Sequence, residues 1–132
     1  MNQRPTSPHI GVYKLGYTML LSGLHRITGM AATVGFFLFA WWLMALASGP
    51  GAYATAMRVL SSPLGKLLLV GFTFSFVYHF CNGIRHMLWD TGRGLERVQA
   101  RRSGVVMAVS AVLLTALVVW LGCAAMSTPG AP

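Results

Sequence analysis

The segment Leu64–Trp89 has the sequence LGKLLLVGFTFSFVYHFCNGIRHMLW and decides the fold, because it is long and apolar enough to cross a membrane. About 20 helical residues span the hydrocarbon core of a bilayer, which is about 30 Å thick. The segment nevertheless contains His79, Arg85 and His86. Ionisable residues at such depths usually face a protein interior, a water path or a cofactor, since an arginine at the bilayer centre costs roughly 2.5–3.5 kcal/mol. We therefore expect a membrane helix that carries a functional site.

Two further segments, Ser22–Ala47 and Gly104–Ala125, are also long and apolar enough to cross a membrane. Hydrophobic residues make up 55% of the 132-residue chain and charged residues only 9%, a composition that excludes a soluble globule of this size. The sequence therefore predicts an all-α membrane protein, with three transmembrane helices in a single membrane-anchor domain over residues 1–132.

The connections carry signals for the ends of helices. Residues 1–21 are expected to form an arm that lacks the apolar core and cleavage site of a secretory signal, so we expect the first span to be retained. Residues 48–51 (SGPG) end the first span, and Pro63 favours the start of the second. Tyr53–Leu60 between them is a candidate for a short interfacial helix. Residues 126–132 are expected to form a tail.

The net charge of +8 is distributed by membrane side. Basic residues lie at the amino end (Arg4, Lys14, Arg26), around the second connection (Arg85, Arg93, Arg97, Arg101, Arg102) and near the first (Arg58, Lys66). With three spans, the amino end and the second connection share one face, which the positive-inside rule makes cytoplasmic, or matrix in a mitochondrion. We expect a multi-pass protein of the bacterial inner membrane, or of the mitochondrial inner membrane in a eukaryote. No nucleic-acid-binding motif accompanies the charge, so its expected partner is the lipid membrane and not nucleic acid.

Two polar clusters are expected to meet at the cytoplasmic face. Ser22, His25 and Arg26 are spaced by three and four residues, so a helix places them on one face at the start of the first span. His86 and Asp90 lie at the end of the second span. Because these two helices run antiparallel, residues about sixty positions apart can form one site.

The histidines of the second span suit a haem that stands edge-on in the membrane. His79 and His86 are nearly two turns apart, about 10 Å along the axis, and His79 is the deeper. Iron at His79 would place the propionates near His86, His25 and the basic residues, whose charge matches carboxylates. Gly83, one turn from His79, either admits the porphyrin to the backbone or packs against another helix.

Each of these residues also has a purely structural interpretation. Arg85 is compatible with a side chain that snorkels to the interface. His25 and His86 are compatible with interfacial histidines bonded to backbone or lipid, and Ser22 with a helix cap. His79 is harder to explain in this way, because it lies some ten residues inside the span. The two cysteines (Cys81, Cys123) lie near opposite membrane faces, so they predict packing residues and no disulfide.

Four motifs together resemble a known family, the cytochrome b subunit of succinate dehydrogenase (complex II). They are RPTSPH at residues 4–9 followed by Tyr13, SGLHRITG at residues 22–29, YHFCNGIRH at residues 78–86 and WDTG at residues 89–92. The resemblance covers most of the first 95 residues in matching order, whereas the third span matches only in its apolar character. The pair of patterns S-x-x-H-R and H-x(3)-G-I-R-H is its most specific part.

The resemblance implies a role for each site residue. It makes His79 an axial ligand of haem b and places His25, Arg26 and His86 beside the haem propionates. It makes Ser22 and Arg26 part of a ubiquinone pocket, with Asp90 close by. The other axial histidine is expected from a second membrane-anchor subunit, and further quinone contacts from that subunit and the iron-sulfur subunit.

The residues themselves support a second chain. Span counting places His25 and His86 near the surface, so we expect no second histidine at the depth of His79 and infer that a six-coordinate haem needs a partner. Such a haem has no open position for oxygen and suits electron transfer. We therefore expect a haem-binding helical bundle, shared with a second anchor subunit, which attaches a flavoprotein and an iron-sulfur subunit to the membrane.

The expected function is to pass electrons from succinate to ubiquinone as part of succinate:ubiquinone oxidoreductase, with no catalysis by this chain alone. Three alternatives stay open. One is the anchor of a quinol:fumarate reductase, and another is a haem-free structural or assembly membrane protein. The third is a transporter with a proton-relay histidine pair, which three short spans with only one deep histidine disfavour.

Overall fold

The computed structural model describes residues 16–127, which form four helices and no strand. The helices are α1 (Tyr17–Ala47), α2 (Pro50–Ser61), α3 (Pro63–Asp90) and α4 (Arg97–Met126). By length and composition, α1, α3 and α4 can each cross a membrane. The predicted all-α membrane architecture is therefore confirmed, and the short helix expected before the second span is α2. The remainder of the arm and tail, residues 1–15 and 128–132, with the first of the four motifs, lies outside the described residues.

The helix boundaries differ most from the predicted spans on the cytoplasmic side of the proposed topology. α1 begins at Tyr17 and not at Ser22, because Leu21 is already buried against the other helices. α4 begins at Arg97 and not at Gly104, since arginines are good helix formers and extend the helix beyond the apolar part. At Pro63 the prediction is correct: the Oγ of Ser62 caps α3 by accepting from the Gly65 N–H at 3.1 Å.

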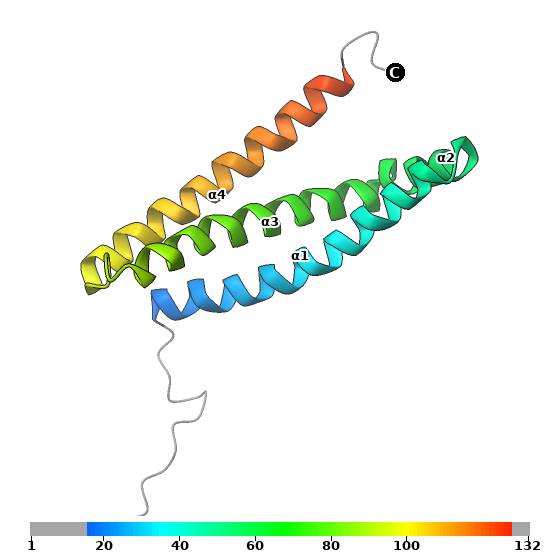
Figure 1. The fold of residues 1–132 in the computed structure, drawn as a ribbon. Helices are drawn as coiled ribbons and strands as arrows, with labels where there is room; N and C mark the ends of the chain where they lie inside the picture. The colour runs from blue at the N-terminus through cyan, green and yellow to red at the C-terminus, as the bar shows by residue number, and fades with distance from the viewer. Residues whose placement is uncertain (1–15, 128–132) are drawn as a thin grey trace, which may run out of the picture.

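α3 is the central helix of the bundle. In Figure 1 it lies between α1 and α4 and runs antiparallel to both. The face of α4 toward α3 is a stripe with spacings of three and four residues: Ala100, Gly104, Met107, Ala111 and Thr115. Beyond Thr115, no described residue of α4 is buried, and the helix leaves the bundle (Figure 1). The three helices therefore meet at one end, and α4 diverges from α1 and α3 at the other.

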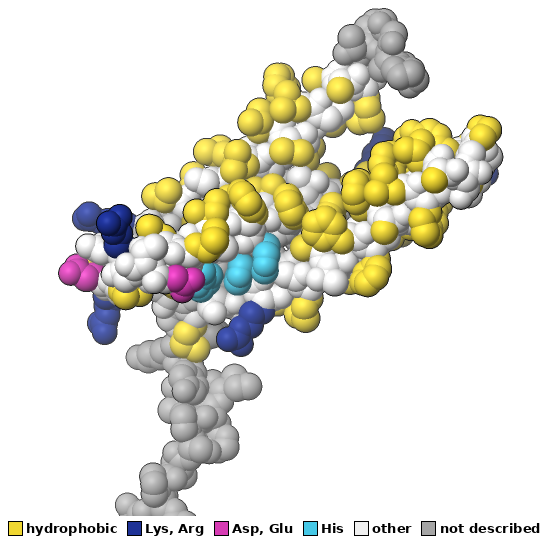
Figure 2. Space-filling model, viewed as in Figure 1, with side chains coloured by type: hydrophobic (Ala, Val, Ile, Leu, Met, Phe, Trp, Pro, Cys, Tyr) yellow, Lys and Arg dark blue, Asp and Glu magenta, His cyan; other side chains and the backbone are white. Residues whose placement is uncertain are grey.

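A small core marks this junction. Leu21 of α1, Tyr78 of α3, and Met107 and Ala111 of α4 form a buried cluster. The Tyr78 hydroxyl donates to the Leu21 carbonyl at 3.3 Å, so its polar end is satisfied inside the bundle. Large apolar side chains elsewhere point outward, as Figure 2 shows for one face. This outward surface is suited to lipid or partner helices.

The two cysteines behave differently from each other. Cys81 packs against the core cluster, as predicted. Cys123 is exposed on the splayed part of α4, so it does not pack in the core of the described chain. Its apolar sequence neighbours indicate a helix but do not indicate which of its faces is covered.

Glycines allow the helices to approach closely at two points. A Cβ at Gly104 would lie 2.7 Å from Leu21 Cδ1 and 3.1 Å from Tyr17 Cε1, at the three-helix junction. At Gly35 of α1, the ring of Phe72 of α3 occupies the space that a Cβ would need. Small residues at such contacts are typical of transmembrane packing, where close backbone approach replaces the hydrophobic effect.

Gly35→Ala should destabilise the bundle by about 1–3 kcal/mol, because the added methyl group must displace Phe72. Gly71→Ala on α3 is the matched control, since a Cβ there meets nothing within 4 Å. The midpoint of thermal unfolding in detergent should fall for the first variant only. Equal midpoints would show that the contact between α1 and α3 is looser than described.

Candidate functional site

Three histidines from two helices form a row between α1 and α3. The ring of His25 stacks on His79, with centroids 4.0 Å apart and planes 8° from parallel, and lies 5.2 Å from the ring of His86. Figure 2 shows the histidines side by side on one face of the molecule. Among the described residues, no group of three or more His, Cys, Asp or Glu side chains could hold a bare metal ion. A group that brings most of its own ligands, such as a porphyrin, is not excluded by this.

The position of His79 is set by α1. Its Nδ1 lies 3.1 Å from the carbonyl oxygen of His25. A carbonyl can only accept, so Nδ1 is the donor, and in the neutral imidazole Nε2 keeps its lone pair. Metal-binding histidines are usually oriented by such a bond at the other nitrogen. The backbone of Gly29 lies against the same ring, and a Cβ there would be 2.8 Å from His79 Cε1. Gly29 was not singled out from the sequence, although its spacing of four from His25 places it on the same face.

His25 lies at the level of His79, which was not predicted. The two rings stack, so both imidazoles occupy the same position along the bundle. The prediction that no second histidine is available at this depth is therefore wrong. However, stacked rings at 4.0 Å leave no room for a porphyrin between them, so His25 and His79 cannot bind one iron from opposite sides. The buried Nδ1 of His25 has no hydrogen-bond partner in the described chain.

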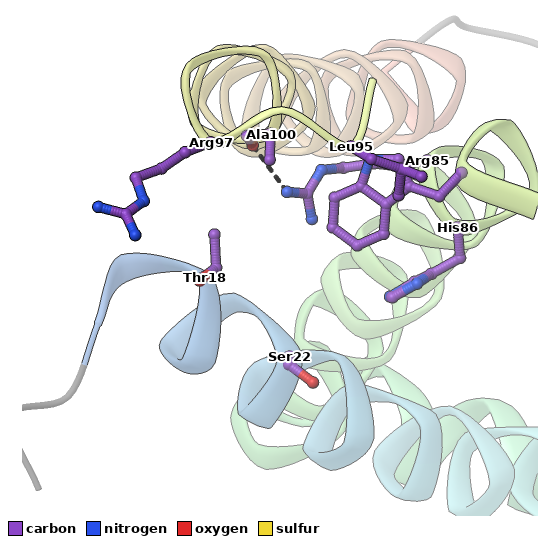
Figure 3. A pocket seen from close by; sticks show the side chains of 8 residues that line it. Thr18, Ser22, Arg85, His86, Leu95, Arg97 and Ala100 are labelled. Carbon is purple, nitrogen blue, oxygen red and sulfur yellow. Dashed lines mark hydrogen bonds between the residues drawn. The ribbon is translucent and has the colours of Figure 1, made fainter. Parts of the chain in front are cut away.

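A pocket of about 410 Å³ lies at the junction of α1, α3 and α4. Its lining combines hydroxyl, guanidinium and imidazole groups with apolar surface: Thr18, Ser22, Arg85, His86, Trp89, Leu95, Arg97 and Ala100. In Figure 3, Thr18 and Ser22 come from α1, while Arg85 and Arg97 approach from the opposite wall. The structure thus brings Ser22 and His86 to one pocket, at the junction of the first span's start with the second span's end.

The other candidate residues lie outside this pocket. Arg26 and Asp90 are exposed, and neither lines it. Gly83 is half-buried, and a Cβ there would meet nothing within 4 Å. No described helix of this chain therefore packs against Gly83, which removes the packing interpretation within the chain and leaves open space beside α3.

Arg85 is buried rather than snorkelling to the interface, with 6% of its surface exposed. Its donors reach α4, at Ser103 Oγ (3.0 Å) and the Ala100 carbonyl (2.7 Å), and Asn82 Oδ1 on its own helix (3.3 Å). Trp89 is half-buried beneath this guanidinium. Sequence spacing did not reveal the contacts of Arg85, because its partners lie on α4. The turn between α3 and α4 sets the direction of that helix, and spacing along one helix does not predict it.

The comparisons with known proteins agree on one family. The sequence profile described as "Succinate dehydrogenase/Fumarate reductase transmembrane subunit" matches residues 1–121. The "Succinate dehydrogenase cytochrome b556 subunit" of Paracoccus denitrificans is 41% identical over 114 residues, which cover 86% of this chain and 88% of the relative. The protein of the same name from Rickettsia felis is 39% identical over 116 residues (88% and 90%).

A mitochondrial relative extends the similarity. The "Succinate dehydrogenase cytochrome b560 subunit, mitochondrial" of Sus scrofa is 38% identical over 117 residues, covering 85% of this chain and 68% of the relative. The matches span the first two membrane helices, the histidine row and most of α4. With its three membrane-spanning helices, the chain belongs to the succinate dehydrogenase/fumarate reductase transmembrane subunit family.

Proposed function

We propose that this chain is the membrane-anchoring cytochrome b subunit of a succinate:ubiquinone oxidoreductase, where it holds haem b and forms part of the ubiquinone-reduction site. The observation that carries the proposal is the fixed imidazole of His79, whose Nδ1 is held by the His25 carbonyl. A membrane helix has little reason to orient a half-buried histidine in this way unless Nε2 has a ligand.

The residues of the row fit haem b. Nε2 of His79 would bind the iron, while His25, Arg26 and His86 would hold the propionates near the membrane surface. The open space beside Gly83 gives a porphyrin access to the α3 backbone. When bound, haem b supplies reversible one-electron transfer at the iron.

The second axial ligand would come from another chain. The other described histidine beside His79 is His25, whose stacked ring cannot approach the iron from the opposite side. A histidine of a second membrane-anchor subunit, placed against the open side of the row, would complete the site. This arrangement is supported by the exposed apolar surfaces of α1 and α3, which suit partner helices.

Ubiquinone is the proposed electron acceptor, and its reduction to ubiquinol consumes two electrons and two protons. The Ser22 hydroxyl would donate a hydrogen bond to a quinone carbonyl from the pocket wall. Arg26, one turn further along α1 and exposed, would favour the negative charge that develops on that oxygen as electrons arrive. Asp90, exposed at the same end of the bundle, would deliver protons from the aqueous side.

The end of the bundle that carries the pocket is also the end proposed to dock the flavoprotein and iron-sulfur subunits. Most of the described arginines gather there, where α3 ends and α4 begins (Figure 2). By the positive-inside rule this end is cytoplasmic in a bacterial inner membrane. Electrons from succinate would thus enter beside the quinone pocket. The family also includes fumarate reductase subunits, whose reaction runs in the opposite direction.

His79→Leu should remove most of the haem absorbance from the purified complex, because it deletes the proposed iron ligand. His86→Leu should retain haem, since its role is proposed at the propionates. A reduced-minus-oxidised spectrum with a haem assay distinguishes the two. Full haem content in the His79 variant would contradict the proposed function of His79 as the iron ligand, whereas a parent complex without haem would favour a haem-free structural protein.

Gly29→Ala should disturb the same ligand from the α1 side, because the new methyl group would press on the His79 ring. We expect lower haem content or an altered low-spin signal in electron paramagnetic resonance. Gly23→Ala, on the same helix but with nothing within 4 Å of its Cβ, serves as the control. Indistinguishable spectra for both variants would mean that the ring position is not set by Gly29.

Arg26→Leu should slow quinone reduction about tenfold or more, since hydrogen bonds to charged groups contribute about 1.5–3 kcal/mol. Ser22→Ala should slow it about fivefold, as expected for a neutral bond of about 1 kcal/mol. Succinate oxidation by a soluble dye should be unchanged in both, and Arg58→Leu, on an exposed position of α2 at the other end of the bundle, should affect neither rate. If Arg26→Leu lowers both rates equally, Arg26 serves assembly instead.

A further inference from the structure

Arg85 joins α3 to α4 through two donors and binds its own helix through a third. Nε donates to Ser103 Oγ at 3.0 Å, Nη2 to the Ala100 carbonyl at 2.7 Å and Nη1 to Asn82 Oδ1 at 3.3 Å. Figure 3 shows the bond to Ala100 across the pocket wall. All three acceptors are uncharged, so the contact is not an ion pair. Its geometry depends on the planar fork of arginine, which lysine does not reproduce.

A buried guanidinium is a costly way to hold two helices together. Taking a charged group out of water costs several kcal/mol, which hydrogen bonds only partly offset. With 6% of its surface exposed, Arg85 bears this desolvation cost beside a buried cluster that is otherwise apolar. This cost points to a role other than stability alone.

The guanidinium also fixes an aromatic side chain. Arg85 Cζ lies 4.0 Å from the centroid of the Trp89 ring, a cation–π contact. Trp89 Nε1 donates to the Gly94 carbonyl in the connection between α3 and α4, at 3.0 Å. The indole is therefore held both on its face and at its nitrogen, so its orientation is defined.

The edge of this indole contacts the histidine row. The rings of Trp89 and His86 are perpendicular, with centroids 5.1 Å apart, and His86 lies 5.2 Å from His25 on its other side. Arg85, Trp89 and His86 all line the pocket. An unbroken series of contacts thus leads from the start of α4 to the imidazole proposed to lie beside the haem propionates.

We propose that Arg85 is a positioning residue: by fixing Trp89 and the start of α4, it sets the orientation of the His86 ring, and through that ring tunes the haem and the quinone pocket. Its connection with haem and quinone rests on the proposed function, whereas the contact series itself does not. Arg85 acts through its neighbours and has no proposed bond to either molecule.

The test uses the whole purified complex with Arg85→Lys, His86→Gln and the double variant. Arg85→Lys should retain haem and the rate of succinate oxidation by dye. Its haem midpoint potential should shift in the same direction as in His86→Gln, and its KM for quinone should rise about three- to tenfold, the loss expected for about one hydrogen bond. The double variant should match His86→Gln alone, because contacting residues that act in series are not additive.

The proposal would be overturned if the shifts in potential and KM of the two single variants add in the double variant. It would also be overturned if the haem midpoint potential is unchanged in Arg85→Lys but shifts in His86→Gln. Arg58→Lys, exposed on α2 at the other end of the bundle, is the matched control and should change nothing. If Arg85→Lys does not assemble, Trp89→Phe replaces it, since this variant keeps an aromatic ring but loses the bond to Gly94. If the haem midpoint potential is then unchanged in Trp89→Phe, the series of contacts from Arg85 through Trp89 to His86 is rejected. Loss of the proposed function itself would be recognised separately, by full haem content in His79→Leu.

Discussion

The bundle is organised by the need of polar side chains on α3 to find partners where no water is available. Within two turns, α3 carries His79, Asn82 and Arg85, and unpaired polar groups in a bilayer cost several kcal/mol each. His79 finds its partner in the α1 backbone, and Arg85 finds two on α4. These bonds place α3 between its neighbours and fix the rotation of each helix relative to it.

The two outer helices have different tasks. α1 presents a carbonyl and a glycine backbone to His79 and contributes His25 to the row. The first half of α4 packs closely through small residues and accepts the donors of Arg85, whereas its second half leaves the bundle. The histidine row and the pocket share His86, so a change in the contact between α3 and α4 can reach both parts of the site.

Much of the architecture follows from local features of the chain. Long apolar segments, the SGPG break and Pro63 predict three spans and a short intervening helix, because hydrophobicity and helix ends depend on residues near in sequence. The free-energy cost of a histidine ten residues inside a span also follows from nearby residues alone. It identifies His79 as a candidate functional residue. Helices α1 and α4 begin before the predicted spans, since the apolar pattern marks the hydrocarbon crossing and not the helix, which continues through residues such as Arg97.

The sequence by itself thus determined the membrane class, the three spans and the importance of His79. Only the tertiary structure decided that His25 stacks on His79, that Gly29 contacts that ring, and that Arg85 binds α4 instead of snorkelling. These contacts join residues 15 to 54 positions apart. They depend on the rotation and axial offset of one helix against another, which composition and periodicity leave open because many registers would bury an equally apolar face.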